Sequence, residues 1–376
     1  MVVPLLDGYL DDGTPDPEAA ARAAGAWLAG GLVGLPTETV YGLAADAQDA
    51  EAVARLYAVK GRPADHPVIV HVLGVEALRG WWEAPNAAAE QLAAAFWPGA
   101  LTVVVARSRR AGDFVTGAQD TVALRCPDHA VARACLRALA ARSGDPARGV
   151  AAPSANRFGR VSPTRAEDVR AELGERMDPA RDLVVDGGPC TIGVESTIVD
   201  CTATPPRVLR VGAIGQEQVD AVLARPPSPL LHPSSGVSPF VGGASASTGR
   251  DPEDLETLRQ ATARVPGTLE SHYSPRARVV LAEPAAVPQT GEALTSGAGR
   301  WGLIAPAGVA TPTGCIRLVA PTSAEDYAHG LYAALRHGDE QGLAVIVAVL
   351  PDRSGGPLAL AVRDRLARAA HPGVIQ

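Results

Sequence analysis

Residues 32–47, LVGLPTETVYGLAADA, hold the pattern that decides the fold. Leu32 to Pro36 is an apolar run of strand length that leads into the polar turn Thr37-Glu38-Thr39. Upstream, Asp16-Pro17-Glu18 predicts a helix start, because aspartate caps helices and proline suits the first helical position; Gly30-Gly31 ends that helix. A helix, a buried strand and a polar turn in this order are typical of an α/β domain that presents functional groups at its strand ends.

The alternation of helices and strands continues to about residue 215. Asp49 to Val59 has helical spacing and stops before Pro63, which cannot continue a helix. Ser162-Pro163-Thr164 followed by Glu167 predicts another helix start with a capping box. Further strand candidates are Pro67–Val72, Leu101–Ala106, Leu183–Asp186 and Thr197–Asp200.

A second unit follows a change of composition. From Pro226 to Gly249 the residues Pro, Ser, Gly and Ala dominate and periodicity disappears, which predicts a linker or long loop, and a short helix follows from Asp251. Alternation resumes after Pro266, without the GxGxxG pattern of dinucleotide-binding folds. We predict a first α/β domain over residues 1–215, a linker over 216–275 and a smaller α/β domain over 276–376. The strand candidates of the smaller domain are Arg278–Glu283, Trp301–Ala305, Ile316–Ala320 and Leu343–Leu350, and its helix candidates are Ser323–His337 and Leu358–Ala370.

Composition predicts a cytoplasmic protein. Its 376 residues, 47% of them hydrophobic, are enough for a large buried core. The five cysteines are odd in number and form no CxxC pair, which argues for a reducing compartment and against a disulfide framework or zinc ribbon. No basic region precedes an apolar stretch at the start, so no signal peptide is expected, and the longest clean apolar run, Leu343 to Leu350, is too short to cross a bilayer.

The charged residues argue against a nucleic-acid-binding protein and single out Lys60. A net charge of −7 speaks against a protein that coats nucleic acid with a basic face, so direct, stable nucleic-acid binding is not expected. Lys60 is the only lysine, and the other basic residues among the 34 are all arginine. A lone lysine in this background suggests a place that needs a compact, rotatable ammonium group.

Polar clusters at the ends of apolar segments suggest that the chain handles anions. Lys60 and Arg62 could neutralise a triphosphate, and Arg125 could hold a carboxylate through both its nitrogens. Each cluster alone is also typical of a solvated turn or a cap. The phosphate loop, HExxH and GxSxG signatures are absent. The remaining polar candidates are Ser154, Asn156 and Ser162 as neutral donors, Ser196 and Thr39 as readers of a hydroxyl or amine, His66, His71 and Thr121.

These clusters stand in a longer set of motifs that resembles a known family. The quoted runs are PTETVYGLAADA, FWPGALTVVV, DTVALRCPDH, AAPSAN, SPTRAEDV, DGGPCTIGVESTIVD and RVLRVGAIG. In this order they are similar to the motifs of YrdC-like L-threonylcarbamoyladenylate synthases and cover roughly residues 15–215. The Ser271-His272-Tyr273-Ser274-Pro275 segment and the runs DYAHGLYAALRHGD and AVRDRLARAA resemble the linker and second domain of the two-domain members.

The resemblance implies a fold, a reaction and a set of sites. It implies a YrdC-like twisted mixed sheet followed by a smaller Rossmann-like α/β domain. It implies that L-threonine, bicarbonate and ATP give threonylcarbamoyl-AMP and pyrophosphate, for modification of the adenosine beside the tRNA anticodon by downstream tRNA threonylcarbamoyltransferase proteins. It places L-threonine against Thr39, His71, Arg125, Ala152 and Ser196. It places ATP against Lys60, Arg62, His66, Thr121, Ser154, Asn156, Ser162 and Arg210, with Tyr273 closing over the nucleotide.

The reaction class sets what else is expected. Lys60, Arg62, Ser154 and Asn156 are the predicted catalytic residues, acting by position and charge without a protein nucleophile. Mg²⁺ is expected on the ATP phosphates, with no metal cage of protein side chains and no organic cofactor. Two alternatives stay open: a carbamoyltransferase that uses carbamoyl phosphate, and an RNA-binding module without catalysis.

Overall fold

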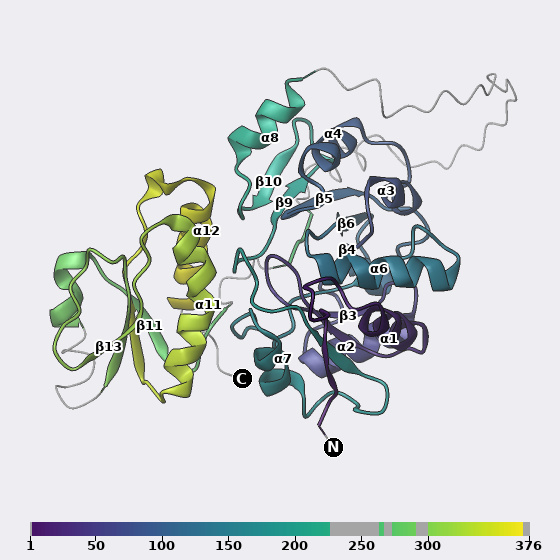
Figure 1. Ribbon diagram of the computed structural model, residues 1–376. Helices are drawn as coiled ribbons and strands as arrows, with labels where there is room; N and C mark the ends of the chain where they lie inside the picture. The colour runs from purple at the N-terminus through teal and green to yellow at the C-terminus, as the bar shows by residue number, and fades with distance from the viewer. Residues whose placement is uncertain (1, 226–262, 267–272, 291–299, 371–376) are drawn as a thin grey trace, which may run out of the picture.

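A computed structural model describes residues 2–225, 263–266, 273–290 and 300–370, which form two sheets with their helices (Figure 1). The predicted linker at Pro226–Gly249 and the helix predicted from Asp251 lie outside these residues. The larger sheet has ten strands in the order β1-β8-β2-β3-β7-β4-β6-β5-β9-β10 and mixes parallel with antiparallel pairs. Its strands are β1 (Leu5–Asp7), β2 (Val33–Leu35), β3 (Gly42–Asp46), β4 (Ile69–His71), β5 (Leu101–Ala106), β6 (Thr121–Arg125), β7 (Val150–Ala151), β8 (Leu183–Asp186), β9 (Thr197–Asp200) and β10 (Arg207–Arg210).

The sequence predicts three helix starts in the larger domain, and those at Asp16 and Asp49 are confirmed. Asp16 caps the first helix, where its carboxylate accepts the Glu18 amide at 2.8 Å, and Pro17 opens it. The prediction of a capping box at Ser162 is wrong, because the helix begins at Ala166 and the residue before it, Arg165, makes no side-chain cap. The Ser162 hydroxyl donates instead to the buried carboxylate of Glu195 at 2.7 Å. The helices are α1 (Pro17–Leu28), α2 (Ala50–Lys60), α3 (Val75–Trp81), α4 (Ala87–Phe96), α5 (Asp113–Thr116), α6 (Ala130–Ser143), α7 (Ala166–Leu173) and α8 (Gln216–Leu223).

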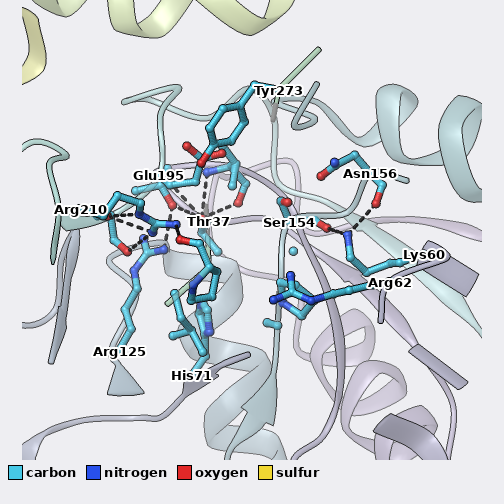
Figure 2. Close-up of a pocket in the computed structure, with 18 of the residues that line it drawn as sticks. Thr37, Lys60, Arg62, His71, Arg125, Ser154, Asn156, Glu195, Arg210 and Tyr273 are labelled. Carbon is cyan, nitrogen blue, oxygen red and sulfur yellow. Dashed lines mark hydrogen bonds between the residues drawn. The ribbon is translucent and has the colours of Figure 1, made fainter. Parts of the chain in front are cut away.

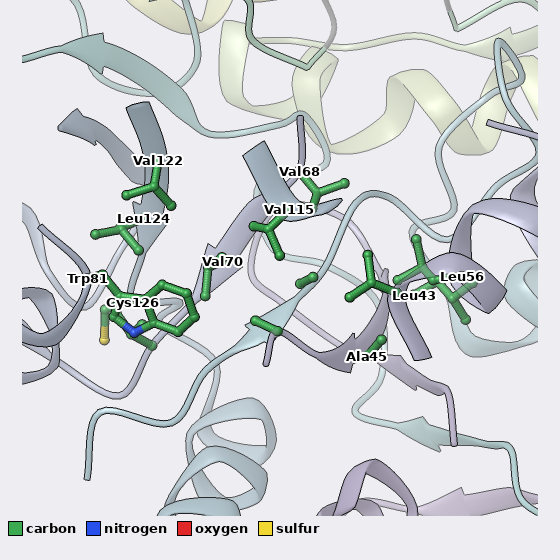
Figure 3. Packing of buried hydrophobic residues seen from close by; sticks show 14 of the residues in the cluster. Leu43, Ala45, Leu56, Val68, Val70, Trp81, Val115, Val122, Leu124 and Cys126 are labelled. Atoms are coloured by element: carbon green, nitrogen blue, oxygen red, sulfur yellow. The ribbon is translucent and has the colours of Figure 1, made fainter. Parts of the chain in front are cut away.

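Strand alternation divides the side chains of the large sheet between two faces, and each face carries part of the core. Leu43 of β3, Val70 of β4 and Leu124 of β6 point into one apolar cluster with Leu56 of α2 and Trp81 of α3 (Figure 3). Successive side chains of a strand point to opposite faces, so the neighbours of these core residues face the other way. That opposite face carries Gly42, Ile69, His71, Ala152 and Arg125, which share one cavity.

The smaller domain has a four-stranded sheet in the order β11-β14-β12-β13, with every pair parallel. Its elements are β11 (Arg278–Leu281), β12 (Trp301–Ile304), β13 (Cys315–Val319), β14 (Val345–Ala348), α11 (Ala324–Glu340), α12 (Gly356–Ala370) and the 3₁₀ turns η2 (Pro284–Ala286) and η3 (Arg353–Gly355). The two long helices lie between this sheet and the larger domain (Figure 1). The mixed sheet and the smaller parallel α/β domain confirm the predicted fold class. None of the helices in the described part of the chain is both long and apolar enough to cross a bilayer.

Candidate functional site

One cavity gathers most of the predicted site residues. Its volume is about 650 Å³, open solvent included, and it lies on the sheet face opposite to the cluster of Leu43, Val70 and Leu124. Arg125, Glu195 and Arg210 lie toward one end, and Lys60 and Arg62 toward the other (Figure 2). The predicted residues that line it are Thr39, Lys60, Arg62, His71, Arg125, Ala152, Ser154, Asn156, Ser196, Arg210 and Tyr273.

Lys60 is the last residue of α2, and the end of that helix aims it at the cavity. Gly61 stops the helix in the left-handed conformation (φ 63°), which glycine adopts without steric cost. Lys60 is 2% exposed as a residue, and its ammonium group donates to the carbonyl oxygens of Ser154 and Asn156, each at 2.5 Å. Burial and the nearby Arg62 hold the pKa of Lys60 well below its usual value. An anion in the cavity would relieve both effects, so the geometry suits phosphate groups.

The opposite end is built around a buried guanidinium. Arg125 closes β6 with 4% of its surface exposed, and its Nη2 lies 2.6 Å from a carboxylate oxygen of Glu38. Its Nη1 donates to the Thr39 hydroxyl at 2.8 Å, and that hydroxyl lies 2.9 Å from the hydroxyl of Thr37. A guanidinium binds carboxylates through two parallel hydrogen bonds, so Arg125 can bind a substrate carboxylate that replaces Glu38 or that lies at another edge of the group.

His71 stands beside Arg125 in register, because β4 and β6 run parallel. The imidazole is 3% exposed, and its Nδ1 has no hydrogen-bond partner among the described residues. Burial, with a smaller effect of the Arg125 charge, lowers the pKa of His71 to about 3. His71 is therefore neutral at physiological pH and can act as a hydrogen-bonding group without adding charge.

The low pKa of His71 predicts acid sensitivity. In the unfolded chain this histidine is protonated below about pH 6.5, whereas in the folded protein it is protonated only near pH 3. Protons therefore favour the unfolded state between these two values, and the free energy of unfolding falls as pH drops through this window. Without substrates, the wild type is expected to lose about 2 kcal/mol more unfolding free energy between pH 7 and pH 5 than His71→Gln. Urea denaturation of both proteins at the two pH values measures this. Equal losses in the two proteins would mean that His71 titrates normally.

Three predicted residues stay outside the cavity lining. Ser162 is buried and donates to Glu195. His66 stacks edge-on against Phe158 at 5.4 Å between ring centroids, and Phe158 does line the cavity. Thr121 opens β6, four residues before Arg125, and Val265 packs on the sheet face beside Ala123.

Sequence reasoning assigned no role to several residues of the site. Thr37 and Glu195 line the cavity, and Glu38 pairs with Arg125. Two donors to Glu195, Tyr332 and Arg365, come from the smaller domain. The acids stand within the quoted motifs and could have been noticed there. No local signal in the sequence connects Tyr332 or Arg365 with Glu195, which lies 137 and 170 positions earlier, respectively.

The arrangement supports stabilisation of charged groups in the cavity. Lys60, Arg62 and Arg125 supply positive charge at two ends, and neutral hydroxyls, carbonyls and an imidazole lie between them. Among the described residues, no group of three or more His, Cys, Asp or Glu side chains could hold a metal ion. Such a cavity can hold a carboxylate at one end and a polyphosphate at the other.

Comparison with known proteins gives this cavity its context. A family model named for Sua5, YciO and YrdC and described as "Telomere recombination" matches residues 26–212, and the model described as "Threonylcarbamoyl-AMP synthase, C-terminal domain" matches residues 214–371. The threonylcarbamoyl-AMP synthase of Pyrococcus abyssi is 35% identical over 94% of this chain and 94% of its own. That of Bacillus subtilis is 35% identical over 96% of each chain.

A solved structure agrees over nearly the whole length. The crystal structure of P. abyssi Sua5 complexed with L-threonine superposes with a TM-score of 0.77 and 34% identity, and it covers 98% of each chain. Similarity of this extent spans both sheets, so it includes the cavity and the smaller domain. The chain therefore belongs to the family of threonylcarbamoyl-AMP synthases, in the form that carries the C-terminal domain.

Proposed function

We propose that the cavity between Arg125 and Lys60 is where this chain joins L-threonine, bicarbonate and ATP. As a member of its family, the chain is a nucleotidyltransferase that forms threonylcarbamoyl-AMP, and the family's role is threonylcarbamoylation of tRNA. The observation that carries the proposal is the pairing of two buried cationic ends, one shaped for a carboxylate and one for phosphates, across a single cavity. Neither the carbamoyltransferase nor the RNA-binding alternative has an observation in its favour.

The proposed roles follow from what each side chain can offer. Arg125 holds the threonine carboxylate, with Thr39 and neutral His71 beside it, and Ala152 and Ser196 complete this end. Lys60 and Arg62 hold the phosphates, while Ser154 and Asn156 fix the turn on which Lys60 rests. Arg210, Tyr273, His66, Thr121 and Ser162 are proposed for the nucleotide; for the last three this requires movement, since none of them lines the cavity.

In the reaction, the threonine amine attacks the carbon of bicarbonate, a carbon–oxygen bond of bicarbonate breaks, and water leaves as the carbamate forms. An oxygen of the resulting carbamate attacks the α-phosphorus of ATP, and the bond from that phosphorus to pyrophosphate breaks. Negative charge grows on the leaving pyrophosphate, where Lys60 and Arg62 stabilise it. Mg²⁺ enters as part of the substrate MgATP, because Glu38 and Glu195, the acids at the cavity, are already paired with arginines.

Compartment and partners complete the proposal. Cys126, Cys135, Cys190, Cys201 and Cys315 are all free thiols, which supports the cytoplasm as the location. Threonylcarbamoyl-AMP is a reactive mixed anhydride, so its consumers are proposed to be downstream tRNA threonylcarbamoyltransferase proteins.

The test is pyrophosphate release by the purified protein with ATP, in the four combinations with and without L-threonine and bicarbonate. Release that needs both, with a product of threonylcarbamoyl-AMP mass, supports the proposal. A folded, ATP-binding protein that releases none under any combination overturns it. Replacement of bicarbonate by carbamoyl phosphate is the control for the carbamoyltransferase reading.

A further inference from the structure

Glu195 is a cavity residue whose carboxylate is held largely by the other domain. It is buried, and Ser162 of the larger domain donates to one of its oxygens at 2.7 Å. The other oxygen accepts the Tyr332 hydroxyl of α11 at 2.8 Å and Arg365 Nε of α12 at 3.2 Å. Arg365 is 1% exposed and also donates to the Val211 carbonyl at 2.7 Å. The smaller domain therefore reaches the wall of the proposed active site through two buried side chains.

The same two side chains contact Tyr273, which lines the cavity (Figure 2). Its ring stacks on Tyr332 with centroids 5.6 Å apart, and the Arg365 guanidinium lies 5.7 Å from the ring centroid. The backbone of Tyr273 has φ 63°, in the left-handed region that bulky residues seldom adopt. A residue stays in such a conformation only where its surroundings determine its position, and here Tyr332 and Arg365 provide those surroundings.

Close backbone packing keeps the two helices at this distance. Gly193, two residues before Glu195, has φ 84°, and a Cβ built on it would come within 2.4 Å of the Ala328 carbonyl oxygen of α11. A Cβ built on Gly215 would likewise come within 2.9 Å of Cγ of Pro357 in α12. Gly193 lets α11 approach the loop that carries Glu195 directly, and Gly215, at the start of α8, lets α12 approach the larger domain.

We propose that Tyr332 and Arg365 are positioning residues of the synthase reaction, through which the C-terminal domain completes the active site by fixing Glu195 and Tyr273. The inference rests on the proposed function. It assigns the domain a part in catalysis itself, in addition to any partner it binds. The hydroxyl of Ser196, the residue next to Glu195, accepts a hydrogen bond from Arg210 Nη2 at 3.2 Å and shares one with the Thr102 hydroxyl at 2.8 Å. The position of Glu195 therefore affects that of Ser196, which lines the end of the cavity proposed for threonine.

The first test removes one hydroxyl group. Tyr332→Phe keeps the stacked ring and loses the bond to Glu195. Tyr327→Phe is a matched control, because Tyr327 is as buried on the same helix but donates to Val349 inside the smaller domain at 2.6 Å. We expect kcat/KM for threonylcarbamoyl-AMP formation to fall about tenfold in Tyr332→Phe and less than twofold in Tyr327→Phe. The loss should lie mainly in kcat, because Arg125 and Lys60 still bind the substrates.

The second test removes the cation. Arg365→Met leaves Glu195 buried with only Arg210 as a nearby cation and with Tyr273, Tyr332 and Ser162 as neutral neighbours. In the wild type, burial raises the pKa of Glu195, but Arg365, Arg210 and the Ser162 hydroxyl lower it by more. We expect Arg365→Met to lose activity as pH falls from 8 to 6, because Glu195 then protonates. Arg365→Met/Glu195→Gln should lose that pH dependence without recovering activity. Arg363→Met is the control, because it removes an arginine of the same helix that donates to the Pro351 carbonyl within the smaller domain at 2.7 Å.

The outcomes separate this inference from the function on which it rests. A wild type that makes no threonylcarbamoyl-AMP refutes the proposed function. An active wild type with folded Tyr332→Phe and Arg365→Met variants that keep wild-type kcat and pH profiles overturns the positioning role. A variant that fails to fold is replaced by Arg365→Lys, which keeps the charge but not the paired bonds to Glu195 and Val211, and which we expect to be at least tenfold slower.

Discussion

Lys60→Ala is expected to lower kcat/KM for ATP by about a thousandfold while the protein still folds. Two of the three ammonium protons go to the Ser154 and Asn156 carbonyl oxygens, which leaves one for an anion in the cavity. Loss of the ammonium therefore removes both a phosphate ligand and the tie that fixes the Ser154–Asn156 turn. Steady-state pyrophosphate release at varied ATP, with saturating L-threonine and bicarbonate, measures the effect.

Stability should respond in the opposite direction. The lowered pKa of Lys60 shows that burial of its charge is unfavourable in the protein without substrate. Lys60→Met, which keeps the length of the side chain without its charge, is therefore expected to unfold no more easily than the wild type and yet to be as inactive as Lys60→Ala. A protein that gives up stability for function at one residue is a common outcome at active sites.

Lys60→Arg separates charge from shape. A guanidinium is planar and larger than an ammonium, and its fixed fork of donors does not match two carbonyl oxygens that a compact, rotatable ammonium reaches together. We expect at least a hundredfold loss of kcat/KM in this variant. Near-wild-type rates in Lys60→Arg would show that only positive charge is needed here, and near-wild-type rates in Lys60→Ala would remove Lys60 from the mechanism.

The fold could be predicted where strands are rich in branched apolar residues. Leu101–Ala106 is β5 to the residue, because LTVVVA is β-branched and bounded by Pro98-Gly99 on one side. Gly42–Asp46, GLAAD, gives no such signal, and it is a strand because its neighbours β2 and β7 pair with it on both edges. Local propensity fails at that point, since tertiary pairing decides the conformation.

The site residues likewise divide into those that the local sequence identifies and those that only tertiary contacts identify. Lys60 and Arg125 could be chosen from the sequence because a lone lysine and a strand-end arginine stand out locally. The hydroxyl of Ser162 could be assigned from sequence either to a helix cap or to a ligand, and in the structure it bonds to Glu195. That choice depends on which groups folding brings within 3 Å, and composition and spacing do not contain this information.

Arg125→Gln is expected to raise the KM for L-threonine at least a hundredfold while the affinity for ATP changes little. The Arg125 guanidinium lies at the carboxylate end of the cavity together with Arg210, whereas Lys60 and Arg62 lie at the other end (Figure 2). Pyrophosphate release at varied L-threonine measures the KM, and equilibrium binding of an ATP analogue measures the second site. The loss of one partner also leaves Glu38 buried without its cation, so this variant should be less stable by about 3–5 kcal/mol.

A second substitution separates that instability from threonine binding. Arg125→Gln/Glu38→Gln removes both charges of the pair and should regain most of the stability, yet it should bind threonine as poorly as Arg125→Gln. Arg148→Gln is the matched control, because Arg148 pairs with the buried Asp46 away from the cavity, so its loss costs stability but should leave the KM unchanged.

Glu38→Gln alone decides what the carboxylate of Glu38 does. Glu38 occupies one edge of the Arg125 guanidinium, 2.6 Å from Nη2, in the position that a substrate carboxylate would favour. If threonine replaces Glu38 there, the single variant should bind threonine at least as tightly as the wild type, because no internal carboxylate competes. If Glu38 instead holds Arg125 in place from behind, the variant should bind threonine more weakly than the wild type but far more tightly than Arg125→Gln. A KM in Arg125→Gln equal to that of the wild type would contradict both, since it would mean that the carboxylate of threonine is bound elsewhere.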